Sequence, residues 1–395
     1  MVGKAGRTVT TMAVRMPVRP ELLAWAADRA GLADEELERR FPKFAEWHSG
    51  ELTPTFKQLE HFAKAAHAPL GYFFLDEPPE EPIPIPDFRT MGNAQVRRAS
   101  PDLLETIYLC QMRQDWYREH AAAEGFDPLS FVGSVDASTP VELVADDIRK
   151  QIGFGLDGRA RFQNWEDARR QLIDSIEGLG VLVMVSGIVG GNTRRKLNPD
   201  EFRGFALSDA VVPLIFVNGA DTKAAQIFTL MHELAHIWAG ETALSDARMS
   251  ATDGHARELW ANRVAAEVLL PLIALRTEYR GMPDVGELQR IAKHFRVSTL
   301  VVLKRIFDAG YLTWDDYRIR YDEELERVLA IMRQRNSGDG GNWHKTQPLR
   351  ISRHFARAVI VDALEGRTLY RDAYALLGTA KHETFQRMAR ELAVA

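Results

Sequence analysis

The pattern His-Glu-x-x-His, formed by His232, Glu233 and His236, lies inside the apolar segment 229–240. This segment lacks Pro and is predicted to form a buried helix with Thr229 as its cap. Side chains four residues apart share one face of a helix, so His232 and His236 can bind the same metal ion. Glu233 lies about 100° further round the helix, where its carboxylate can reach a water molecule on that metal. These residue types at this spacing indicate the chemistry of a zinc peptidase.

The same pattern also arises by chance, mostly on solvated helices. Here it is surrounded by Leu230, Met231, Leu234 and Trp238. Burying two imidazoles and a carboxylate among such side chains without partners costs about several kcal/mol. Because a bound metal ion satisfies these groups, the sequence favours a metal site over an accidental match.

A catalytic zinc needs a third protein ligand and an open position for water. The metzincin pattern is absent, because Ala239 and Thr242 stand where it requires Gly and His. The predicted helix 255–271 instead offers Glu258 as the third ligand, and Asn262, four residues later, can hydrogen-bond a ligand His. Three nearby side chains are alternative ligands: Asp253, His255 and Glu267.

Short β-rich segments precede the predicted metal-binding helix, at 181–185, 202–207 and 214–217. They are separated by Gly, Asn, Asp and Pro, which predicts a small sheet. The edge strand of such a sheet in a zinc peptidase commonly pairs with the extended substrate backbone. Residues 240–254 are rich in small and polar side chains, so we expect a loop between the two metal-binding helices.

Two blocks of sequence carry a family resemblance, one from Phe228 to His236 and the other from Glu258 to Pro271. Together with Arg203-Gly204-Phe205-Ala206 and the stretch from Pro213 to Asn218, they resemble the ImmA/IrrE family of bacterial metallo-endopeptidases. The chain departs from many members at Trp260, where they have a second Glu.

The resemblance implies a zinc-dependent endopeptidase of narrow specificity that cleaves a regulatory protein, in several members a helix-turn-helix repressor. On that pattern Zn²⁺ is held by His232, His236 and Glu258, and Glu233 moves the proton. An antitoxin-like role is the alternative, because members of the family also occur beside small toxin genes. In that role the chain binds and neutralises a partner toxin, with DNA-binding autoregulation.

Composition places limits on the location and partners of the chain. Its 395 residues carry a formal net charge of −5, so any DNA contact requires a local basic patch. The single cysteine, Cys110, cannot form an internal disulfide. The sequence shows no membrane span and no signal-peptide core. We therefore expect a cytoplasmic protein without membrane contact.

Two segments resemble helix-turn-helix motifs. Segment 20–75 is predicted to form short helices, and its sequence around Phe44 to Thr55 is similar to Xre-type domains. It offers few side chains that read base edges, so a docking or scaffold module is the alternative. Segment 284–313 repeats the helical pattern with a mildly positive patch, for which ordinary helix packing is the alternative. Either segment is a candidate for DNA binding.

The predicted fold is a mainly helical α+β protein in which a zincin-like peptidase domain is flanked by helical-bundle domains. In the Pro-rich linker, Ile83, Ile85 and Phe88 alternate with prolines, so the linker is expected to lie along the next domain. The predicted segments are, in order, a flexible N-terminus (1–19), an Xre-like helical domain (20–75), a Pro-rich linker (76–100), the zinc metallopeptidase domain (101–283), a helix-turn-helix-like extension (284–334), a Gly-rich joint (335–347) and a C-terminal helical domain (348–395).

Overall fold

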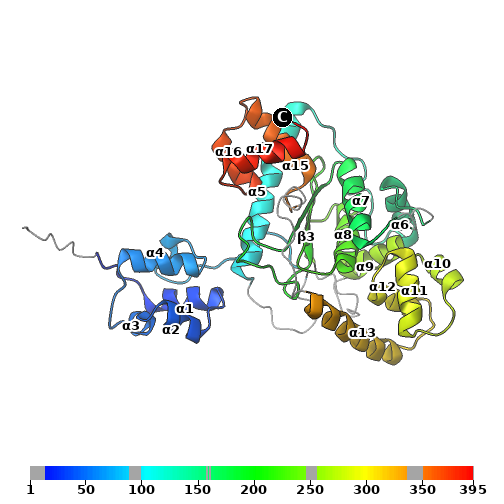
Figure 1. Cartoon of the computed structure of the whole chain (residues 1–395), viewed down its shortest axis with the longest axis horizontal. Helices are drawn as coiled ribbons and strands as arrows, with labels where there is room; N and C mark the ends of the chain where they lie inside the picture. Colours follow the sequence, from blue (N-terminus) through cyan, green and yellow to red (C-terminus); the bar gives the residue numbers. More distant parts are fainter. Residues whose placement is uncertain are drawn as a thin grey trace, which may run out of the picture. The chain divides into compact units, whose positions relative to one another are not determined.

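The computed structural model describes residues 14–88, 99–156, 159, 162–245, 256–335 and 350–394 (Figure 1). The chain forms two compact units. The first ends at Ile83 and also contains the start of the long helix α5 (Pro101–Glu124), and the second contains Pro84–Phe88 and the chain from Glu105 onward. The joint expected at 335–347 lies outside the described residues, apart from residue 335.

The first unit is built from short helices that enclose an apolar core. Its elements are α1 (Pro20–Arg29), α2 (Asp34–Arg40), α3 (Phe44–His48), α4 (Phe56–Ala65) and the 3₁₀ helix η1 (Leu70–Phe74). Leu22, Leu23, Leu59 and Phe62 lie at the centre of the core. Thr55 and Gln58 form a capping box that fixes the start of α4. The sequence predicted short helices here, and an Xre-like role in DNA binding stays a prediction.

A four-stranded mixed sheet lies within the second unit. Its strands are β1 (Leu182–Ser186), β2 (Gly204–Leu207), β3 (Leu214–Asn218) and β4 (Ala243–Ser245), in the order β1-β3-β2-β4. β1 runs parallel to β3, whereas β2 is antiparallel to both of its neighbours. The expected loop at 240–254 is therefore wrong at its start, because Ala243–Ser245 pairs with β2. A strand of three residues is too short to show a sequence period.

Helices surround this sheet, and α8 (Lys223–Trp238) lies beside it (Figure 1). The prediction that Thr229 caps this helix is wrong. The cap is Thr222, whose side chain accepts a hydrogen bond from the Ala225 N–H at 3.0 Å. Residues 223–228 contain no helix breaker, so the helix begins earlier and Thr229 is buried within it.

The remaining helices complete the second unit and confirm a mainly helical α+β fold. They are α6 (Val141–Gln151), α7 (Trp165–Gly178), α9 (Ala256–Leu269), α10 (Leu272–Glu278), α11 (Val285–Phe295), α12 (Thr299–Asp308), α13 (Trp314–Arg335), α15 (Arg353–Leu364), α16 (Tyr370–Leu377) and α17 (His382–Glu391). Helices α8, α9, α11 and α12 contribute to one apolar core. Within the described part of the chain, every helix is too short or too polar to span a bilayer.

A buried carboxyl group joins α7 to the start of α15. The Arg353 N–H donates to Glu177 Oε1 at 3.1 Å, and Glu177 is 2 % exposed. Burial raises the pKa of Glu177 from its ordinary value of 4.5 to about 7, although hydrogen bonds from Ser352 and backbone groups oppose the rise. The folded chain therefore binds a proton here over a pH range in which the unfolded chain has lost it.

We predict that Glu177→Gln removes a pH dependence of stability. One pKa unit corresponds to about 1.4 kcal/mol, so the free energy of unfolding of the wild type should fall by roughly 3 kcal/mol between about pH 4.5 and pH 7 from this group. Gln keeps an acceptor for Arg353 and cannot ionise, so the variant should be the more stable protein at pH 8. Urea unfolding from pH 5 to pH 8 measures the difference. If the free energies of unfolding of the two proteins changed in parallel with pH, Glu177 would not be the group responsible for the pH dependence.

Candidate metal centre

Helices α8 and α9 bring three buried side chains to one point. His232 and His236 lie one turn apart on α8, and Glu258 lies in the first turn of α9. Their ligand atoms all lie within 4.8 Å of one another. Over the described ranges of the chain, no second group of three or more His, Cys, Asp or Glu side chains meets this condition. The packing of α8 against α9 therefore assembles the three ligands that the sequence singles out.

The distances between these atoms suit a single metal ion. The two His Nε2 atoms are 3.2 Å apart, and Glu258 places Oε2 at 3.2 Å from His232 Nε2 and Oε1 at 3.1 Å from His236 Nε2. Ligands held at about 2.0–2.1 Å in a tetrahedral zinc site lie roughly 3.3 Å from one another. Both Glu258 oxygens are buried, and their polar contacts within the described structure are these two imidazole nitrogens. Two nitrogens and one oxygen are a donor set of catalytic zinc sites.

The charges at this point favour a bound cation. Burial tends to raise the pKa of Glu258, but the two His side chains outweigh it and lower that pKa to about 2. Burial tends to lower the pKa of His236, and hydrogen bonds to Glu241 and Glu258 raise it to about 10. The cluster thus holds a carboxylate that needs positive charge nearby. A divalent ion supplies that charge in place of the His proton.

Oxygen acceptors orient both imidazoles through their other nitrogen. His232 Nδ1 lies 3.0 Å from Asn262 Oδ1, on the residue that the sequence named for this contact. His236 Nδ1 lies 3.3 Å from Glu241 Oε2, and Arg257 Nε lies 3.2 Å from the other oxygen of Glu241. A proton on each Nδ1 leaves each Nε2 lone pair directed at the metal position.

The sequence did not predict a role for Glu241, although a local signal is present. Gly240 follows α8 with φ +70°, and the Glu241 N–H donates to the His236 carbonyl at 2.9 Å. The Gly240 N–H donates to the Ile237 carbonyl at 3.0 Å, which completes a Schellman turn. This turn folds the chain back, so that Glu241 meets the side chain of His236.

The carboxylate of Glu233 is buried beside the three candidate ligands, at 0 % exposure. Its Oε2 accepts a hydrogen bond from Ser245 Oγ at 3.2 Å, while Oε1 is buried without a partner in the described part of the structure. Burial raises the pKa of Glu233 well above its usual value, so this group readily takes up a proton. Ser245 belongs to β4, the strand that was not predicted from the sequence.

Strand β2 passes so close to α8 that only glycine fits at residue 204. A Cβ atom there would lie 2.6 Å from Thr229 Cγ2, 2.8 Å from the Phe216 carbonyl oxygen and 3.0 Å from Glu233 Oε1. The backbone of Gly204 therefore forms the wall against which Glu233 rests.

Of the alternative ligands named from the sequence, Glu267 lies within the described residues and does not join the group. Glu267 forms a buried ion pair with Arg305. Asp253 and His255 lie outside the described residues. The pairing with Arg305 explains why Glu267 is buried without a metal.

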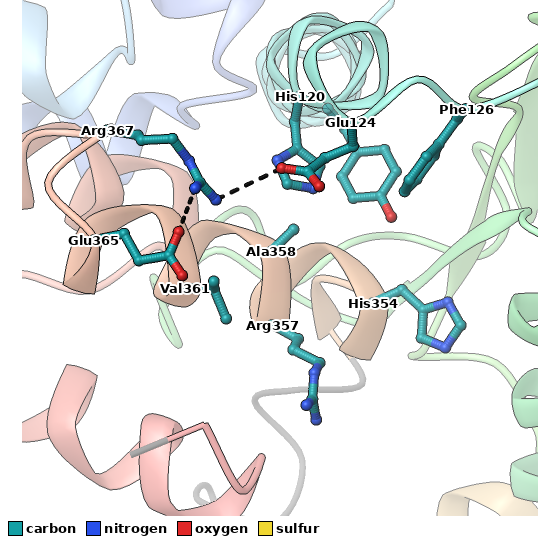
Figure 2. Close-up of a pocket in the computed structure, with 10 residues that line it drawn as sticks. His120, Glu124, Phe126, His354, Arg357, Ala358, Val361, Glu365 and Arg367 are labelled. Carbon is teal, nitrogen blue, oxygen red and sulfur yellow. Dashed lines mark ion pairs between the residues drawn. The ribbon is translucent and has the colours of Figure 1, made fainter.

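A cavity of about 480 Å³ lies between α5 and α15, and its lining contains none of the candidate ligands (Figure 2). It presents His120 and His354 together with Arg357. Arg367 is paired with Glu124 at 3.7 Å and also with Glu365 (Figure 2). These ion pairs partly neutralise the charges of Glu124 and Glu365 in the cavity wall. We therefore assign the candidate metal site to His232, His236 and Glu258 and not to this cavity.

Comparison with known families agrees with the geometry. Residues 176–307 match the IrrE N-terminal-like domain of the M78 peptidases, and residues 351–391 match a domain of unknown function, DUF8813. No curated protein and no solved structure matches the chain significantly. The first match spans all four strands together with α8 and α9. The chain therefore contains an IrrE-like peptidase domain with a buried His-His-Glu group that can hold a metal.

We predict that Gly204→Ala destabilises the second unit by about 1–3 kcal/mol, because the new methyl group overlaps Thr229 and the β3 backbone. Urea unfolding measures the loss. Gly178→Ala is the matched control, since a Cβ at this helical position meets no atom within 4 Å. Equal stability of the two variants would contradict the close approach of β2 to α8.

We predict that Glu241→Gln weakens metal binding by roughly 10- to 100-fold, because the charge that orients His236 is lost. Competition with a chromophoric chelator measures the affinity. Glu142→Gln, at an exposed position on α6, is the matched control and should leave the affinity unchanged. A Glu241→Gln variant with wild-type affinity would show that Glu241 does not support the ligand.

Proposed function

We propose that the chain is a zinc-dependent endopeptidase of narrow specificity that cleaves a regulatory protein. The main support for this proposal is the buried carboxylate of Glu233 beside the candidate ligands. A site that only binds metal needs His232, His236 and Glu258, but it has no use for a further buried carboxylate with an unpartnered oxygen. General-base catalysis does require such a group next to the metal.

Each residue of the site has a role in peptide hydrolysis. His232, His236 and Glu258 would hold the zinc ion, with Asn262 and Glu241 fixing the two imidazoles. Zinc, when bound, supplies a Lewis acid that polarises the scissile carbonyl and makes water more acidic.

The proton transfers are assigned to Glu233. Oε1 accepts the proton of the attacking water, and the protonated carboxyl group then delivers it to the leaving amine. Ser245 holds Oε2, so the free oxygen keeps a fixed direction. The raised pKa that burial gives Glu233 suits this cycle, because the group must hold a proton between the two transfers.

The burial of the site supports a narrow choice of substrate. His232, Glu233 and His236 are each 0 % exposed. A substrate must therefore displace part of the protein before its peptide bond reaches Glu233, and only a partner with extensive contacts provides the necessary binding energy. A folded regulatory protein, such as the helix-turn-helix repressor implied by the family resemblance, has enough surface for this.

We predict that Glu233→Gln retains zinc and lowers the rate of cleavage by roughly 10²- to 10⁴-fold, because the amide cannot accept the proton. Purified wild type and variant are incubated with the proteins encoded beside the gene, and products are identified by mass spectrometry. Glu142→Gln serves as the control and should cleave at the wild-type rate. If wild type binds zinc and a neighbouring protein but cuts nothing, the chain acts as an antitoxin-like binding protein instead.

A further inference from the structure

A segment of the Pro-rich linker pairs with β4 along the outer edge of the four-stranded sheet. We call Pro84–Phe88 the strap. The Leu244 N–H donates to the Pro86 carbonyl at 2.9 Å, and the Phe88 N–H donates to the Leu244 carbonyl at 3.0 Å. Asp87 is the parallel partner of Leu244. Ile85 anchors the strap through a side chain that is only 6 % exposed.

The strap is hydrogen-bonded to the backbone groups of β4 that face away from β2. Alternate residues of an antiparallel strand direct their N–H and C=O groups to opposite sides. In β4 the outward-facing groups are those of Leu244, and both are bonded to the strap. The described part of β4 therefore has no backbone group left with which an extended peptide could pair.

This edge adjoins the candidate metal centre. The ring centroid of Phe88 lies 6.3 Å from that of His236. Ser245, the residue after Leu244, holds the carboxylate of Glu233. A peptide paired with β4 would thus run past both the metal position and the proton acceptor, which is the path that the strap follows.

We propose that the strap is an intrasteric occupant of the substrate-binding edge, so that a substrate must displace Pro84–Phe88 before it pairs with β4. This inference rests on the proposed peptidase function. An extended peptide that adds to a sheet edge gains its affinity from main-chain hydrogen bonds, and the strap competes for the same groups. The apparent affinity of a substrate therefore equals its intrinsic affinity multiplied by the fraction of molecules in which the strap is released, so release of the strap raises it.

The test releases the strap without altering β4 or the metal ligands. Ile85→Ser removes the buried anchor, and Phe88→Ala removes the ring beside His236. Pro82→Ala, an exposed residue of the same linker, is the matched control. Hydrogen exchange at the Leu244 amide reports release of the strap, and binding of prolyl-leucyl-glycyl hydroxamate to the zinc-loaded protein reports access to the site.

We expect Ile85→Ser and Phe88→Ala to exchange the Leu244 amide faster and to bind the hydroxamate at least about tenfold more tightly than wild type and Pro82→Ala. Unchanged exchange in both variants would overturn the proposal. Faster exchange with unchanged or weaker hydroxamate binding would also overturn it, because the strap would then form part of the binding site. Failure of the proposed function appears separately, as a wild type that binds no zinc, or as one that binds zinc and a neighbouring protein without cutting it.

Discussion

Four ionisable side chains are buried against one another at the centre of this protein, and the neighbouring elements must accommodate them. His232, Glu233, His236 and Glu258 lie in the core between α8, α9 and the sheet. Without a partner such groups cost several kcal/mol, roughly the scale of the whole net stability of a domain. Their convergence is tolerable when a cation binds at the centre. The surrounding turn and strands hold these four side chains in place.

Local backbone features position the side chains that contact His236 and Glu233. The Schellman turn after α8 returns Glu241 to His236, and β4 places Ser245 against Glu233. Gly204 lets β2 approach α8 closely enough to support the same carboxylate. Short-range turn geometry, strand pairing and the absence of one side chain therefore act together on two side chains of the candidate site, the His236 imidazole and the Glu233 carboxylate.

The sequence predicted the parts of the site that follow from helical spacing. His232, Glu233, His236, Glu258 and Asn262 lie on two helices, where residues four apart share a face. Glu241 and Ser245 could not be predicted in the same way, because their positions depend on a turn and a strand of three residues. The alternation of Ile85 and Phe88 with prolines predicted that the linker lies along the next domain, but the pairing of the strap with β4 is a contact between distant segments that the sequence does not specify. The cap of α8 was misplaced because two Thr residues stand before helix-compatible sequence, and residues 223–228 between them contain no helix breaker, so the helix extends back to Thr222.

X-ray absorption at the zinc K-edge tests directly whether His232, His236 and Glu258 hold a metal, because it measures the ligands of the metal in the intact protein. We expect about one zinc per chain, bound by two imidazole nitrogens and by oxygen donors at about 2.0–2.2 Å, with one imidazole contribution lost in His236→Ala. A wild type purified with zinc in the buffer that carries no metal, or a spectrum unchanged in His236→Ala, would contradict it.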